Sequence, residues 1–320
     1  MKDELTKSAE IVITQCVALR KNENILVLFD APERRIANAL FEVGKRYANE
    51  AIAVEITPRA NHGEEPPDMV AEIMPLFDVI LIPTSRSLSH TDARRAACAK
   101  GARIATLPGI IEDTFIRTLN ADYNRIAELS NKLAHLLTEA KRARVVTDIG
   151  TDITMSLETR KGHADTGILH KPGDFSNLPA GEAYIAPLEG TAEGVYIVDG
   201  SMKDSGVLQP NEYITITVRD GYATEIKGGK SAEDIIHTVE KYGKDALNIA
   251  ELGIGTNYKA KIIGNVLEDE KVLSTVHIAI GDNKSMGGNV NVPSHLDGII
   301  RNPTLFLDDK MIMEKGEILV

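Results

Sequence analysis

Short apolar runs alternate with helix-period segments over roughly the first 145 residues of the chain. Four such runs are bounded by polar turns: Ile25–Asp30, Ile52–Ile56, Val79–Ile82 and Ile104–Leu107. Strands that are apolar almost throughout are typical of a parallel sheet whose two faces are covered by helices. The pattern therefore predicts an N-terminal doubly wound α/β domain over residues 1–143.

After Val145 the sequence pattern changes to strands of alternating polarity that are separated by glycine turns, such as Asp199-Gly200 and Asp220-Gly221. Such turns favour antiparallel hairpins. A long helical segment, about Ile111 to Arg142, is expected to link the two halves, and one helix near Ala232–Tyr242 interrupts the strands. We expect a larger, strand-rich α+β domain over residues 144–320, which carries the metal-binding and catalytic residues.

Composition narrows the class of protein. A chain of 320 residues is longer than a single domain with one hydrophobic core usually is, so two domains are expected. Its net charge of −11 argues against a surface that binds the phosphates of a nucleic acid. Cys16 and Cys98 are the two cysteines, which argues against a disulfide framework. No stretch reaches the length of a membrane span. We expect a cytoplasmic enzyme that acts on a peptide or small molecule and has neither a nucleic acid nor a membrane as its partner.

A hydroxyl-rich loop, Thr84–Thr91, follows the third predicted strand. Loops at the carboxyl ends of parallel strands often meet ligands, so this loop is a candidate border of the site. The simpler interpretation is that Ser89 or Thr91 caps the next helix. No Gly-x-Gly-x-x-Gly motif follows the first strand, so a nucleotide site is not supported.

The strongest chemical signal lies in the last quarter of the chain. His277 sits in the strand-like run Ser274–Gly281, and His295-Leu296-Asp297 follows eighteen residues later. Side chains alternate along a strand, so His295 and Asp297 share one face. With His277 on a neighbouring strand, they would form a two-imidazole, one-carboxylate set that suits Fe(II), Zn and other divalent metals.

Four segments of the second half resemble the M29 family of metallopeptidases, the aminopeptidase T and aminopeptidase S group. They occur in the family's order: Asn177–Tyr184, Ala250–Asn257, Thr275–Gly281 and His295–Gly298. The resemblance implies a homodimeric metallo-aminopeptidase, a hydrolase that releases N-terminal residues from short peptides.

The resemblance also implies a centre of two divalent ions, Zn, Co or Mn, with Glu251 as a catalytic group. The implied metal ligands are Glu182, Glu251, His277, His295 and Asp297. Two metal ions would polarise the scissile carbonyl and lower the pKa of a bound water. Each residue also has a simpler interpretation, because a glutamate can be a surface charge and a strand histidine can be a hydrogen-bonded core residue.

One departure from the peptidase pattern keeps other functions open. The peptidases carry a tyrosine shortly after the histidine that corresponds to His277, where this chain has Asp282–Gly288. The 2,5-dihydroxypyridine 5,6-dioxygenases resemble the same motifs, and that resemblance implies one Fe(II) on His277, His295 and Asp297. A third alternative is a ligand-binding protein that has inherited the fold without its chemistry.

Overall fold

The computed structural model describes residues 2–320, and the chain divides into two compact units. The first unit comprises Met1–Ala127 and Gly167–Ala180, and the second comprises Glu128–Thr166 and Gly181–Val320. The chain therefore passes between the units three times. Division into compact units does not test independent folding, so the domain boundary expected after residue 143 remains a prediction.

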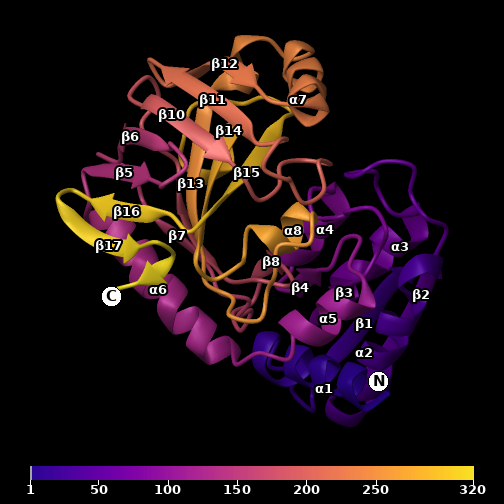
Figure 1. The fold of residues 1–320 in the computed structure, drawn as a ribbon. Helices are drawn as coiled ribbons and strands as arrows, with labels where there is room; N and C mark the ends of the chain where they lie inside the picture. Colours follow the sequence, from indigo (N-terminus) through magenta and orange to yellow (C-terminus); the bar gives the residue numbers. More distant parts are fainter. Residues whose placement is uncertain (1) are drawn as a thin grey trace. The chain divides into compact units, whose positions relative to one another are not determined.

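The first unit is built on a five-stranded parallel sheet in the order β2-β1-β3-β4-β8 (Figure 1). Its strands are β1 (Asn24–Asp30), β2 (Glu50–Ile56), β3 (Val79–Ile82), β4 (Arg103–Thr106) and β8 (Phe175–Asn177). The first four are the strands that the apolar runs predict. The fifth is a three-residue strand contributed from much later in the chain, which the sequence pattern does not reveal.

Helices cover both faces of this sheet. They are α1 (Lys2–Ile11), α2 (Arg34–Tyr47), α3 (Asp68–Ile73), α4 (Asp92–Ala99) and α5 (Glu112–Thr118). Ala93 and Ala97 of α4 pack in one hydrophobic cluster with Leu26 and Ile80. Gly44 of α2 lies on the opposite face, against Ile25. The doubly wound arrangement follows from strands that are apolar on both sides.

The Thr84–Thr91 loop is stabilised by contacts within the first unit. The backbone N–H of Ser85 donates to Asp30 at 2.9 Å, and the Ser89 hydroxyl lies 2.9 Å from that of Thr106. Thr91 accepts from the backbone N–H of Arg94 and so caps α4, as the simpler interpretation of this loop predicted.

The expected single helix from Ile111 to Arg142 is wrong in its bounds. The structure has two helices, α5 and α6 (Tyr123–Glu139), and Arg142 already begins a strand. The break occurs because the carboxylate of Asp122 accepts the backbone N–H groups of Asn124 and Arg125, which starts a new helix.

The second unit contains two antiparallel sheets. One has eight strands in the order β12-β11-β10-β6-β5-β16-β17-β18, and the other has five in the order β15-β14-β13-β9-β7. The eight-stranded sheet consists of β5 (Arg142–Val146), β6 (Asp152–Ser156), β10 (Glu193–Val198), β11 (Ile214–Arg219), β12 (Tyr222–Lys227), β16 (Thr304–Leu307), β17 (Lys310–Glu314) and β18 (Glu317–Ile318). The five-stranded sheet consists of β7 (His163–Asp165), β9 (Glu182–Ile185), β13 (Ile249–Gly255), β14 (Thr275–Gly281) and β15 (His295–Arg301).

One hydrophobic core joins the two sheets with α6 and α7 (Lys230–Glu240). It contains Tyr196 from the larger sheet, Ile278 from the smaller one and Leu133 from α6. A short helix, α8 (Val266–Asp269), precedes β14. The predicted fold class, a parallel α/β part followed by a larger strand-rich α+β part, is confirmed. Among residues 2–320, the structure has no helix with the length and apolar character needed to cross a bilayer.

Candidate metal centre

The five-stranded sheet of the second unit has one apolar face and one polar face. Along β13, Leu252 and Ile254 point into the hydrophobic core. Glu251, Gly253 and Gly255 alternate with them and therefore face the other way. The same alternation runs through β9, β14 and β15, so the polar face is specified by the sequence of four strands.

All five metal ligands implied by the sequence lie on this polar face. Glu182 begins β9, Glu251 lies on β13, His277 on β14, and His295 and Asp297 on β15. Ala279 pairs with Glu251 on one side and with Asp297 on the other. Because Ala279 is small, the side chains on either side can meet above it. We call these five residues the carboxylate–imidazole cluster.

Glu251 lies at the centre of the carboxylate–imidazole cluster. Its Oε1 is 3.2 Å from Nε2 of His277, and its Oε2 is 3.2 Å from Nε2 of His295. The second of these nitrogens is also 3.3 Å from Oδ1 of Asp297. On the other side, Nε2 of His277 is 3.4 Å from Oε2 of Glu182. A continuous row of polar atoms thus connects Glu182 to Asp297.

Gly253 determines the position of the His277 ring. It pairs with His277 on β14 and with Tyr184 on β9. A Cβ atom at Gly253 would lie only 1.9 Å from Nε2 of His277. Only glycine therefore allows the fully buried imidazole to lie across β13 and reach both glutamates.

His295 is oriented by the segment that stands where the peptidases carry their tyrosine. Its Nδ1 lies 2.8 Å from the backbone carbonyl of Asp282, which can only accept a hydrogen bond. Nδ1 therefore carries a proton, and Nε2, which is directed at the cluster, can bind a metal once it has released its own proton. The side chain of His295 is 31 % exposed, so this end of the cluster is open to solvent.

The segment around Asp282 is itself fixed by polar contacts. Buried Asn283 donates from Nδ2 to Oε1 of Glu189 at 2.9 Å. The same oxygen accepts the backbone N–H of Asn289 at 2.8 Å, and Arg160 pairs with the other carboxylate oxygen. Glu189 and Arg160 thus hold the loop whose carbonyl orients His295, a role that the sequence did not reveal.

When no metal is bound, the carboxylates and imidazoles of the cluster shift one another's pKa values. Burial disfavours the charged form of His277, but the adjacent Glu251 and Glu182 outweigh it and raise the pKa of His277 to about 9. The pKa of His295 is raised well above its usual value because Asp297 and Glu251 outweigh its desolvation. The two imidazoles in turn hold the pKa of Glu251 below its ordinary range despite its burial.

Glu182 differs from the other carboxylates of the cluster. Burial is the largest influence and raises its pKa to about 7, although Lys271 and His277 act in the opposite direction. Its Oε2 is buried and has no hydrogen-bond partner among the described residues. Oε1, by contrast, accepts from the Lys271 ammonium at 2.7 Å.

Lys271 is the main group at this site that the sequence motifs do not include. It follows α8, and its side chain lies among the carboxylates of Glu182, Glu270 and Asp165. In the sequence, Glu270-Lys271 looks like an ordinary pair of surface charges. Only the turn after α8, which brings the ammonium to Glu182, distinguishes it.

Two histidines outside the motifs have different positions. His163 on β7 stacks against Tyr184 with ring centroids 5.4 Å apart, on the polar face of the five-stranded sheet. Burial raises the pKa of Tyr184, so its hydroxyl stays protonated and can donate. His170 belongs to the first unit, where its Nε2 lies 2.7 Å from the backbone carbonyl of Gln15.

The donor atoms of the cluster fit a divalent metal ion. They form two overlapping groups, Glu182–Glu251–His277 and Glu251–His295–Asp297. Two ligand atoms about 2.1 Å from one ion and about 100° apart are separated by about 3.2 Å. The separations of 3.2 to 3.4 Å between neighbouring donors match this value. Oε2 of Glu182, which has no hydrogen-bond partner among the described residues, is one of these donors.

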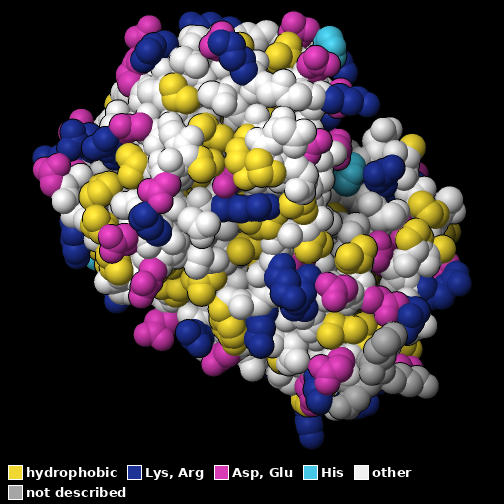
Figure 2. Space-filling view, viewed as in Figure 1, with side chains coloured by type: hydrophobic (Ala, Val, Ile, Leu, Met, Phe, Trp, Pro, Cys, Tyr) yellow, Lys and Arg dark blue, Asp and Glu magenta, His cyan; other side chains and the backbone are white. Residues whose placement is uncertain are grey.

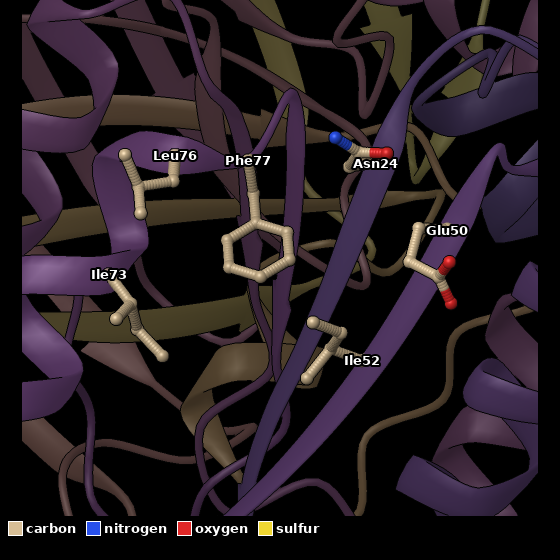
Figure 3. A pocket seen from close by; sticks show the side chains of 6 residues that line it. All are labelled: Asn24, Glu50, Ile52, Ile73, Leu76 and Phe77. Atoms are coloured by element: carbon tan, nitrogen blue, oxygen red, sulfur yellow. The ribbon is translucent and has the colours of Figure 1, made fainter.

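An apolar pocket of about 320 Å³ lies elsewhere, in the first unit (Figure 3). Phe77, Ile73 and Ile52 contribute most of its apolar lining, and Asn24 and Glu50 lie at its rim where β1 and β2 begin. Ligands of open α/β sheets usually bind at the carboxyl ends of the strands. This pocket lies at the opposite end and carries one carboxylate, so it offers little chemistry.

Charged side chains of both signs are interspersed on the face drawn in Figure 2. Lys and Arg there do not gather into one continuous patch.

Fold and cluster together define a class of metalloprotein in which a centre of carboxylates and imidazoles is carried on one face of an antiparallel sheet. The family model of NicX, 2,5-dihydroxypyridine 5,6-dioxygenase, matches residues 4–320. The chain belongs to this family.

Individual relatives agree with the family model. The 2,5-dihydroxypyridine 5,6-dioxygenase of Pseudomonas putida KT2440 is 25 % identical over 350 residues, covering 100 % of this chain and 95 % of that protein. A solved structure of the dioxygenase from that organism superposes with a TM-score of 0.79 at 22 % identity, covering 100 % of this chain and 98 % of the other.

The M29 peptidases are related in fold. Wild-type AmpT from Thermus thermophilus has a TM-score of 0.72 at 16 % identity, with full coverage of both chains. This likeness is one of fold alone.

The expectation of a metallo-aminopeptidase is wrong. The family model and the relative in Pseudomonas putida both identify a dioxygenase, an oxidoreductase and not a hydrolase. The error has a physical reason, because a set of carboxylates and imidazoles is compatible with either chemistry. The Asp282–Gly288 segment, which stands where the peptidases carry a tyrosine, lies outside the matching motifs.

Proposed function

We propose that this protein is an Fe(II)-dependent dioxygenase that opens the ring of a 2,5-dihydroxypyridine. The observation that carries the proposal is the family match over residues 4–320. The chain also has two candidate donor groups, each with one imidazole and two carboxylates, and the two groups share Glu251. His277, His295 and Asp297 would hold the ion, since two histidines and one carboxylate suit non-haem Fe(II) oxygenases. Bound iron supplies the one-electron chemistry that allows O₂ to react with an aromatic ring.

Glu251 has two tasks under this proposal. Its carboxylate contacts Nε2 of both histidines and so keeps both rings turned toward one point. In the metal-free protein it is ionised, because the two imidazoles lower its pKa. An ionised carboxylate beside the ligands can accept the proton of a substrate hydroxyl.

The surface beside His277 suits a planar substrate. Tyr184 and His163 form a stacked pair on the same face of the sheet, and the His277 ring lies over Gly253 on the strand next to Tyr184. An aromatic ring can stack on such a pair in an offset or edge-on arrangement. This flat, partly aromatic strip favours a small heteroaromatic substrate.

The reaction balances without an added reductant. The C5–C6 bond of the substrate breaks, and each of the two carbon atoms gains one oxygen atom of O₂. The electrons that reduce O₂ come from the substrate itself. One O₂ is therefore consumed for each ring opened, which gives the proposal a stoichiometry to measure.

An oxygen electrode tests this function. Metal-free protein is reloaded anaerobically with Fe(II) and mixed with 2,5-dihydroxypyridine, with the 2,3- and 2,6-isomers as comparison substrates. We expect equimolar loss of O₂ and of substrate absorbance with the 2,5-isomer, and loss of both signals in His295→Ala. Iron-loaded wild-type protein that consumes no O₂ with 2,5-dihydroxypyridine would refute the proposal.

We also propose a homodimer, which size-exclusion chromatography with light scattering measures directly. A mass near 35 kDa would refute it, because one chain has a mass of 34.8 kDa.

A further inference from the structure

A buried lysine is in direct contact with the carboxylate–imidazole cluster. Lys271 is 3 % exposed, and its Nζ lies 2.7 Å from Oε1 of Glu182, 2.6 Å from Oε1 of Glu270 and 3.6 Å from Oδ2 of Asp165. A lysine is almost never buried so completely unless it is paired. Here one ammonium serves three carboxylates.

The backbone holds Lys271 in place on both sides. Its N–H donates to the carbonyl of Glu268 at 2.9 Å, and its carbonyl accepts the N–H of Asn257 at 2.8 Å. The ammonium is thus a fixed positive charge, delivered from the turn that follows α8.

Glu182 is shared between Lys271 and the metal-binding part of the cluster. One oxygen accepts from the ammonium, and the other is 3.4 Å from Nε2 of His277 without a hydrogen bond. Glu182, Glu251 and His277 form one of the two groups able to hold an ion. A divalent ion on this group would share the Glu182 carboxylate with the ammonium and would be repelled by it at short range.

We propose that the ammonium of Lys271 takes the place of a second metal ion and makes this a centre for one divalent cation. Two overlapping donor groups share Glu251, and Lys271 neutralises Glu182, which a second ion would need as a ligand, while His277 remains available to the one ion. The inference rests on the proposed function only in taking one iron as the native content of each chain.

Metal counting tests the role of Lys271 separately from activity. Metal-free protein is incubated anaerobically with excess Mn(II), desalted, and analysed for manganese per chain and by electron paramagnetic resonance. We compare wild type with Lys271→Met and with Lys132→Met, a change of an exposed lysine on α6. Lys271→Gln, which can still donate to Glu182 and Glu270, serves if the methionine variant does not fold.

We expect one manganese per chain in wild type and Lys132→Met, with the signal of isolated ions. Lys271→Met should bind two, with the altered spectrum of a coupled pair, and its second site should bind at least about a hundredfold more tightly than any second site in wild type. The double variant Glu182→Gln/Lys271→Met should return to one.

The inference fails if wild type binds two ions, or if folded Lys271→Met and Lys271→Gln both bind one ion as tightly as wild type does. Oxygen uptake by the iron-loaded wild type is scored separately. An active wild type with an unchanged ion count in the lysine variants refutes this inference and leaves the proposed function intact. The expected ion counts without oxygen uptake do the reverse.

Discussion

Replacing Gly253 by alanine is a direct test of how the sheet positions a metal ligand. The added Cβ would lie 1.9 Å from Nε2, 2.2 Å from Cε1 and 2.7 Å from Cδ2 of His277. An unstrained contact needs about 3.4 Å, so the ring must retreat by about 1.5 Å (3.4 minus 1.9). The ring is fully buried, so its neighbours must move with it.

The required displacement is large compared with the tolerance of a metal site. Distances between a metal and its ligands are held to about 0.2 Å, so a shift of about 1.5 Å removes His277 from the ion. Loss of a group that merely orients a ligand costs about 10- to 100-fold in metal affinity. We expect at least that loss for Gly253→Ala, together with about 1–3 kcal/mol of unfolding free energy from overpacking.

Competition between Fe(II) or Co(II) and a chromophoric chelator measures the affinity, and urea unfolding of the metal-free protein measures the stability. Gly229→Ala is the matched control. Gly229 precedes α7 with a negative φ of −78°, and an added Cβ there would have no neighbour within 4 Å. Unchanged metal affinity in Gly253→Ala would show that His277 is not a ligand, or that its ring does not need this glycine.

Three further predictions follow from the charges of the protein. Glu251→Gln should lower oxygen uptake by at least about a hundredfold, since general-base contributions are typically 10² to 10⁴, and iron content measured alongside separates lost chemistry from lost metal. In the metal-free protein the raised pKa of His277 stabilises the fold fully below about pH 6.5, and this contribution is lost as the pH rises through about 9. The free energy of unfolding, measured in urea, should therefore decrease by up to about 3 kcal/mol over this range, and His277→Gln should abolish the decrease. Arg103 forms a buried ion pair with Glu23, with contacts of 2.9 and 2.7 Å. Arg103→Met should lower the free energy of unfolding by about 3–5 kcal/mol, because it leaves the Glu23 charge buried without its partner. Arg95→Met, at an exposed ion pair, should lower it by at most about 1 kcal/mol.

The polar face of the five-stranded sheet was predictable because a strand has a period of two. β9, β13 and β14 each place one ligand-type residue on this face, and β15 places two at alternate positions, while core residues such as Leu252 and Ile278 point to the other face. Once His295 and Asp297 share a strand, pairing with the strand of His277 brings the three together. Convergence of the five residues therefore followed from motif order and alternation.

Features that depend on distant backbone were not predictable. Lys271 and the carbonyl of Asp282 reach the cluster through turns whose geometry leaves no motif, and β8 is a three-residue strand paired with a partner some seventy positions earlier. The reaction could not be assigned for the same reason. A set of carboxylates and imidazoles is compatible with both chemistries, so the ligand-type residues alone did not decide between them.

Because β8 lies far along the chain from the other strands of its sheet, the first unit cannot finish folding early in synthesis. β4 pairs with β3 on one side and with β8 on the other, so the sheet of the first unit stays incomplete until residue 177 has left the ribosome. The intervening 39 residues (128 to 166) belong to the second unit and emerge first. Until then Arg103–Thr106 is an edge with unpaired backbone groups, of the kind that recruits strands from other chains. A gene fragment ending at residue 143 would lack β8 and would leave that edge of β4 permanently unpaired.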